Sequence, residues 1–225
     1  MIEVVPTVVP DSLNKVVTRH ARYSTFANTL HIDIADGLFA PNTTWKFDGE
    51  RKLLGAESFV YEAHLMVQDP EDWIVACADA GFRRVVVHVE ALSKFSRVAE
   101  VPQKTLSAFR EAGIPAIGIG VLFGTPPDAV GSIVGACDFL HLMTIKTIGT
   151  QGIPYAKEAP ARVAEFHARF PKMLISVDGG VSEENIADLA RAGARRFCVG
   201  SALANAEDPA AVYKILQETA ENAIQ

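Results

Sequence analysis

Short, nearly continuous runs of apolar residues alternate along the whole chain with longer segments in which apolar residues recur at helical spacing. The short runs are rich in Val, Ile and Phe, as strands are. Strands that are apolar on both faces are typical of a parallel sheet covered by helices. The pattern therefore predicts an α/β fold, a (β/α)8 TIM barrel that forms a single domain over residues 1–225. The predicted strands are residues 3–9, 30–36, 59–67, 83–90, 115–122, 138–145, 173–180 and 195–202.

Turn residues mark the ends of the predicted helices. Ser12, Asp69 and Ser182 each precede a segment of helical period, where a short polar side chain suits the helix start. Glycine suits the position just after a helix, because it adopts the left-handed conformation without strain. The helical segments are residues 13–24, 71–81 and 183–193, and the closing glycines are Gly81, Gly113 and Gly193.

Composition narrows the class of protein. The 225 residues are 49% hydrophobic and carry a net charge of -6 with both signs interspersed, which favours a small-molecule protein over a nucleic-acid-binding one. Cys77, Cys137 and Cys198 lie far apart without CxxC spacing, so neither a disulfide framework nor a structural zinc site is expected. The N-terminus has no basic start followed by a long apolar core, and no apolar run approaches the roughly 20 residues that span a bilayer. We therefore expect a cytoplasmic protein with no nucleic-acid or membrane partner.

Polar residues at the ends of predicted strands suggest the chemistry. In the segment "LHIDIADGLFAPN", His31 and Asp33 are two residues apart and must share one face of a strand. Burying such a pair is costly unless a metal ion or a proton-transfer task compensates. His64 and Asp178 lie late in two other strands, at the barrel end where TIM-barrel sites occur. Any one of these residues alone is more simply a hydrogen-bonded polar side chain, but the four together suit Zn²⁺, Fe²⁺, Mn²⁺ or Co²⁺ without selecting one.

Glycines after the last two strands suggest a phosphate site. The segments "DGGV" and "VGSA" place Gly179, Gly180, Gly200 and Ser201 in the loops that most often bind phosphate in this fold. Backbone N–H groups at glycine can approach an anion because no Cβ is in the way. A phosphorylated substrate is therefore expected.

The sequence resembles the ribulose-phosphate 3-epimerase family over nearly its whole length. The segments that carry the resemblance, in order, are "PTVVPDS", "HIDIADGLFAPN", "AHLMVQDPEDWI", "HVEA", "LMTI", "VDGGVSEENI" and "VGSALANAEDP". The resemblance implies a homo-oligomeric, metal-dependent ketose-phosphate 3-epimerase that interconverts D-ribulose 5-phosphate and D-xylulose 5-phosphate. It implies that His31, Asp33, His64 and Asp178 bind one divalent metal ion and that Asp33 and Asp178 also exchange protons on opposite faces of the sugar. Inversion next to a carbonyl needs such a pair, with the enediolate charge stabilised by a Lewis acid.

The resemblance also implies a set of substrate-binding residues and exposes departures from the family pattern. The expected set is Thr7, Met66, Met143, Gly149, Gly152, Gly179, Gly180, Gly200 and Ser201. Ala35 stands where the family usually has methionine, which either admits a longer substrate or leaves space for a neighbour such as Phe39 or Phe123. The loop "KTIGTQGIPY" replaces a glycine-rich segment of the family, and its Thr150 and Gln151 are further candidate phosphate donors. Lys146 either reaches the substrate or lies on the rim, and for His88 and Glu90 we expect a hydrogen bond to a metal ligand.

Other functions remain alternatives. An epimerase of another ketose phosphate, such as D-allulose 6-phosphate, is motivated by Ala35 and the altered loop. A decarboxylase or aldol-type relative is disfavoured, because those enzymes carry a "DxKxxD"-like motif and "HIDIADG" has no lysine. A non-catalytic sugar-phosphate binder is disfavoured because it would not need paired acid–base groups.

Overall fold

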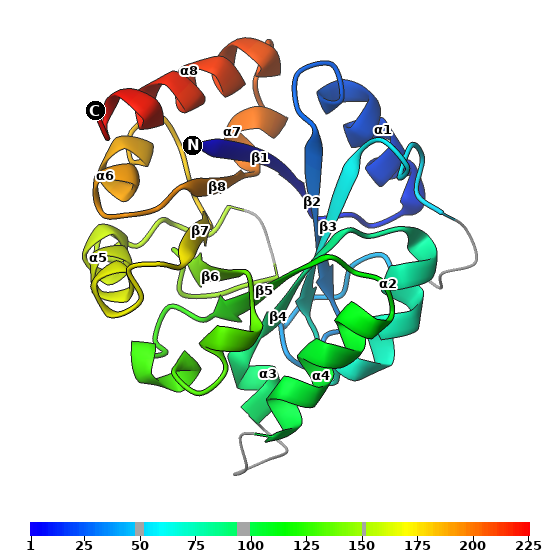
Figure 1. Ribbon diagram of the computed structural model, residues 1–225. Helices are drawn as coiled ribbons and strands as arrows, with labels where there is room; N and C mark the ends of the chain where they lie inside the picture. Colours follow the sequence, from blue (N-terminus) through cyan, green and yellow to red (C-terminus); the bar gives the residue numbers. More distant parts are fainter. Residues whose placement is uncertain (48–51, 94–99, 150–151) are drawn as a thin grey trace.

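The computed structural model describes residues 1–47, 52–93, 100–149 and 152–225 and forms a closed parallel barrel (Figure 1). The strands pair in sequence order, and β8 closes the barrel against β1. Each strand lies inside its predicted range, except that β2 begins one residue earlier, so the predicted (β/α)8 fold is confirmed. The strands are β1 Glu3–Val8, β2 Thr29–Ala35, β3 Val60–Met66, β4 Arg84–His88, β5 Ala116–Val121, β6 Phe139–Met143, β7 Leu174–Asp178 and β8 Arg196–Val199.

Helices surround the barrel on its outer side (Figure 1). This cover explains why the strands are apolar on the face that points away from the barrel axis. Among the described residues, no helix is long and apolar enough to cross a membrane. The helices are α1 Leu13–Tyr23, α2 Ile74–Ala80, α3 Val89–Ser93, α4 Glu100–Glu111, α5 Ala159–Arg169, α6 Ile186–Arg191, α7 Ser201–Ala204 and α8 Pro209–Asn222, with short 3-10 turns η1 Pro70–Trp73, η2 Pro127–Val130 and η3 Val134–Ala136.

The helix ends match the predicted glycines better than the predicted caps. Gly81, Gly113 and Gly193 all have positive φ angles, as expected for residues that close a helix. Ser12 precedes α1, but its hydroxyl donates to Asp11 and makes no capping bond. The predicted start at Ser182 is wrong for α6, because Asn185 is the residue that precedes the helix.

The barrel interior is unusually polar. Along β2, alternation directs Leu30, Ile32 and Ile34 outward to the helices, and His31 and Asp33 inward. The other strands place further polar or charged side chains in the interior at 9% exposure or less. These buried residues include Thr7, Glu62, His64, His88, His141, Ser176, Asp178 and Arg196. Such a set is costly to bury unless its members pair with one another or bind an ion.

Candidate active site

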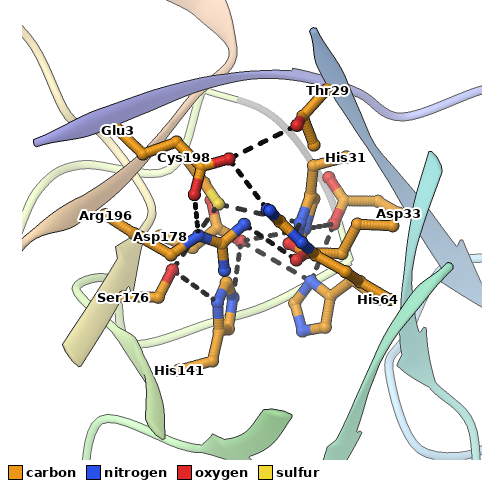
Figure 2. Close-up of polar contacts among 12 residues, drawn as sticks. Glu3, Thr29, His31, Asp33, His64, His141, Ser176, Asp178, Arg196 and Cys198 are labelled. Carbon is orange, nitrogen blue, oxygen red and sulfur yellow. Dashed lines mark hydrogen bonds and ion pairs between the residues drawn. The ribbon is translucent and has the colours of Figure 1, made fainter. Parts of the chain in front are cut away.

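The four predicted metal ligands converge at the C-terminal end of the barrel (Figure 2). Oδ1 of Asp33 is 2.8 Å from Nδ1 of His64 and 3.3 Å from Nε2 of His31. Oδ2 of Asp178 lies 3.6 Å and 3.9 Å from the same two nitrogen atoms. Ligands about 2.0–2.2 Å from a tetrahedral ion are roughly 3.3–3.6 Å apart, so these spacings are close to those of a coordination shell.

The hydrogen bonding of His31 fits a metal ligand. Its imidazole is fully buried, and Nδ1 lies 2.6 Å from Oε1 of Glu62. If Nδ1–H donates to this carboxylate, Nε2 keeps a lone pair that points toward Asp33 and Asp178. In the described part of the chain, Nε2 has no hydrogen-bond partner. A divalent ion would satisfy this atom, and the mixed nitrogen and oxygen donors suit a first-row metal.

A charged network lies beneath His31. Glu62 accepts a hydrogen bond of 2.8 Å from Arg196, and Arg196 donates another of 2.7 Å to Glu3 (Figure 2). Burial alone would raise the pKa of Glu62, but Arg196 and the bond from His31 hold the pKa of this carboxyl well below its usual range. Glu62 is therefore ionised and fixes the orientation of His31. Glu62 lies two residues before His64, so the alternation of a strand already indicated that both face the interior.

A second relay holds His64. Its Nε2 is 2.9 Å from Nε2 of His88, and Nδ1 of His88 is 3.4 Å from a carboxylate oxygen of Glu90. The predicted hydrogen bond between His88 and a ligand is therefore confirmed. Burial lowers the pKa of His64 to about 4, so its imidazole is neutral near pH 7. Glu90 belongs to α3 and not to the predicted fourth strand, because the chain turns helical at Val89.

His141 on β6 also reaches the cluster, although the sequence pattern assigned it no defined role. Its Nε2 lies 3.6 Å from Oδ2 of Asp178, and its Nδ1 lies 3.2 Å from Oγ of Ser176. The donor atoms of His31, His64, His141 and Asp178 all lie within 4.8 Å of one another. Ser176 and Asp178 are two residues apart on β7 and therefore share the inward face.

The two predicted acid–base carboxyls have opposite electrostatic environments. Burial and the charge of Asp33 raise the pKa of Asp178 to about 6. Burial also acts to raise the pKa of Asp33, but the neighbouring imidazoles of His31 and His64 hold it below the usual range. One carboxyl of the pair can therefore carry a proton while the other is ionised, which is the state that a two-acid proton transfer requires.

A cavity of about 260 Å³ opens above these carboxyls. Its lining includes Asp33 and Asp178 and every residue predicted to contact substrate, which are Thr7, Met66, Met143, Gly149, Gly152, Gly179, Gly180, Gly200 and Ser201. Gly179 has a φ of 114°, and a Cβ atom there would lie 2.7 Å from Ile145, so a larger residue would not fit. Thr150 and Gln151 lie outside the described residues.

Ala35 does not enlarge this cavity. It is 4% exposed and packs in a small apolar cluster with Met66, Met143 and Ile148, to which Phe39 adds its ring. Phe123 packs against the main core instead. Of the two interpretations of Ala35, the structure therefore favours space filled by neighbours. Lys146 is exposed and is not among the cavity-lining residues.

Comparison with known proteins places this geometry in a family context. The family model described as "Ribulose-phosphate 3 epimerase family" matches residues 5–204. The chain is 31% identical over 208 residues to the ribulose-phosphate 3-epimerase of Mycobacterium leprae, which covers 91% of this chain and 89% of that protein. It is 32% identical over 186 residues to the ribulose-phosphate 3-epimerase of Aquifex aeolicus, with 81% and 80% covered.

Solved structures of lower identity show the same fold. A 3-hexulose-6-phosphate synthase from Salmonella typhimurium is 16% identical with a TM-score of 0.67, covering 99% of this chain and 100% of that one. KGPDC from Streptococcus mutans, solved in complex with ribose 5-phosphate, is 11% identical with a TM-score of 0.73, covering 100% and 99%. These likenesses concern the barrel alone.

Proposed function

Because the chain belongs to the ribulose-phosphate 3-epimerase family, we propose that it interconverts D-ribulose 5-phosphate and D-xylulose 5-phosphate. Relatives with this name are epimerases, and epimerases are isomerases. The observation that carries the proposal is the placement of Asp33 and Asp178. Both line the cavity, both approach the same two imidazoles, and their pKa values are shifted in opposite directions.

The two carboxyls act from different sides of the barrel mouth. Asp33 ends β2, and Asp178 ends β7, with β1 and β8 between them around the barrel. The ionised member removes the C3 proton, and the protonated member delivers a proton to the opposite face of the same carbon. In the reverse reaction the two residues exchange these tasks. This symmetry suits a reaction whose substrate and product differ only in configuration at one carbon.

His31, Asp33, His64 and Asp178 are the residues that would hold the metal ion in this proposal. When bound, a divalent ion supplies Lewis-acid stabilisation for the negative charge that develops on the substrate oxygens. Glu62 and His88 orient the two imidazoles from behind. The donor types admit Zn²⁺, Fe²⁺, Mn²⁺ or Co²⁺.

The glycine-rich loops would bind the phosphate. Gly179 and Gly180 follow β7, Gly200 and Ser201 follow β8, and all four line the cavity. Their backbone N–H groups can approach an anion closely. The complex of KGPDC with ribose 5-phosphate, on the same fold, supports a sugar phosphate as the occupant. Met66 and Met143 would cover the reacting carbon and exclude water from it.

Solvent-proton exchange at C3 tests the proposal. Metal-loaded protein is incubated in D₂O with D-ribulose 5-phosphate, and in parallel with D-allulose 6-phosphate, and deuterium at C3 is followed by NMR. We expect exchange and epimerisation with the pentulose phosphate, abolished in Asp33→Asn and in Asp178→Asn. Asp128→Asn, which removes an exposed carboxylate far from the cavity, serves as the matched control.

Each other outcome rejects part of the proposal. Faster exchange with the hexulose phosphate would assign the alternative substrate. Binding without exchange in folded, metal-loaded protein would identify a sugar-phosphate binder. Full activity of either Asp→Asn variant would remove that residue from the proton transfer.

Location and assembly are further proposals. The resemblance implies a homo-oligomer. A rice relative that is 29% identical over 197 residues, covering 87% of this chain and 83% of that protein, is the cytoplasmic isoform of the enzyme, which supports the same location here.

A further inference from the structure

His141 is a buried histidine that the proposed ligand set leaves without a task. It lies on β6, is fully buried, and its Nε2 has no hydrogen-bond partner within the described residues. A buried nitrogen without a partner costs about 1–3 kcal/mol. The atom points into the ligand cluster, and its distance to Asp178 is drawn as a dashed line in Figure 2.

The spacing of this nitrogen equals that of an accepted ligand. Nε2 of His141 and Nδ1 of His64 both lie 3.6 Å from Oδ2 of Asp178. The rings of His141 and His31 are stacked, with centroids 5.3 Å apart and an interplanar angle of 16°. The donor atoms of His31, His64, His141 and Asp178 therefore form a compact group without Asp33.

Ser176 sets the orientation of the ring. Nδ1 of His141 is 3.2 Å from Oγ of Ser176, inside the barrel. When Nδ1–H donates to this hydroxyl, Nε2 carries the lone pair and faces the cluster. The same arrangement fixes His31 through Glu62, so two imidazoles are held from behind by different partners.

We propose that His141 is an additional metal donor of this site, through Nε2. The inference rests on the metal site of the proposed function. It implies that His31, His64, His141 and Asp178 hold the ion even when Asp33 is engaged in proton transfer. A site with a third imidazole is richer in nitrogen and favours Zn²⁺, Co²⁺ or Fe²⁺ over Mn²⁺.

Metal binding without substrate tests this assignment. Metal-free protein is titrated with Co²⁺, the visible d–d bands are recorded, and the affinities for Co²⁺ and Mn²⁺ are measured by competition with a chelator. In His141→Leu we expect at least a roughly tenfold loss of Co²⁺ affinity, a change in the d–d bands, and a smaller preference for Co²⁺ over Mn²⁺. His167→Leu, which removes a histidine on α5 outside the barrel, should leave all three unchanged.

Two further variants keep the test decisive if His141→Leu folds poorly. Ser176→Ala retains the imidazole but frees its orientation, so we expect weaker Co²⁺ binding with a milder spectral change. Asp33→Asn should still bind Co²⁺, whereas Asp33→Asn combined with His141→Leu should lose it. Unchanged affinity and spectrum in both His141→Leu and Ser176→Ala would overturn the assignment.

These readouts separate the inference from the proposed reaction. If Co²⁺ binding depends on His141 but C3 exchange is absent, the ligand assignment stands and the epimerase proposal fails. If exchange occurs but Co²⁺ binding does not respond to His141, the reverse holds.

Discussion

The imidazoles of His64 and His88 face each other through their Nε2 atoms, which are 2.9 Å apart inside the barrel. Since Nδ1 of His64 faces Asp33 and Asp178, its proton must sit on Nε2 when a cation is bound, and His88 must accept it. His88 then donates from Nδ1 toward Glu90, 3.4 Å away. The relay therefore fixes the proton of a metal ligand from a helix outside the strands.

Replacing His88 with leucine should weaken both the fold and the metal site. The buried Nε2–H of His64 would lose its acceptor, which costs about 1–3 kcal/mol of unfolding free energy. Metal affinity should fall by roughly 10- to 100-fold, because the ring is no longer oriented. Urea denaturation and metal titration measure the two effects. His88→Gln, whose amide oxygen can accept the bond, should recover part of the affinity, and equal affinity for the two variants would contradict the relay.

The ion pair of Arg196 and Glu62 predicts a strong charge-specific effect. Arg196→Met leaves Glu62 buried and ionised without its cation, so we expect a loss of about 3–5 kcal/mol in the unfolding free energy. The double variant Arg196→Met with Glu62→Gln should recover much of this loss, because no buried charge remains. Denaturant unfolding of both variants at pH 7 makes the comparison. A double variant as unstable as Arg196→Met would show that packing, not charge, dominates.

The same pair predicts an acid limb of stability. The pKa of Glu62 is depressed in the folded protein, so its contribution is complete above the ordinary value of 4.5 and is lost as the pH falls below it. Glu62→Gln should therefore flatten the dependence of the unfolding free energy on pH below that value. Parallel slopes for the wild type and Glu62→Gln between pH 3 and 5 would rule this out.

Asp178 should show the opposite sign in metal-free protein. Its pKa is raised from 3.8 to about 6, so the folded state binds the proton more tightly than the unfolded state does. The unfolding free energy should fall as the pH rises through this window, by on the order of 2–3 kcal/mol for this group. Asp178→Asn should lack that fall while being inactive. Denaturation in chelator between pH 4 and 7 measures it, and a wild-type curve that rises as steeply as the variant's would refute the shift.

Ala35 should resist enlargement. Its Cβ lies 3.9 Å from the position that a Cβ would take at Gly149, and Met66, Met143 and Ile148 pack in the same cluster. Ala35→Met should cost about 1–3 kcal/mol of unfolding free energy by overpacking and should raise KM by displacing the loop at Gly149. Ala161→Met, on the exposed face of α5, is the control. A stable Ala35→Met with unchanged KM would show that the space is open after all.

The sequence by itself determined the barrel and most of the residues at its mouth. Strand period and burial are local properties, so runs such as that around His31 and Asp33 could be assigned and their shared face deduced. The closed parallel barrel then required His64 and Asp178, at the same ends of other strands, to lie nearby.

Only the tertiary structure decided which distant side chains complete the site. Arg196 meets Glu62, and His141 meets Asp178, because barrel closure and strand register bring β8, β3, β6 and β7 to a common axis. Whether Ala35 opens a space depends on where the loop at Ile148 and Gly149 folds back. Such contacts depend on packing between segments far apart in the chain, and no local period of the sequence encodes them.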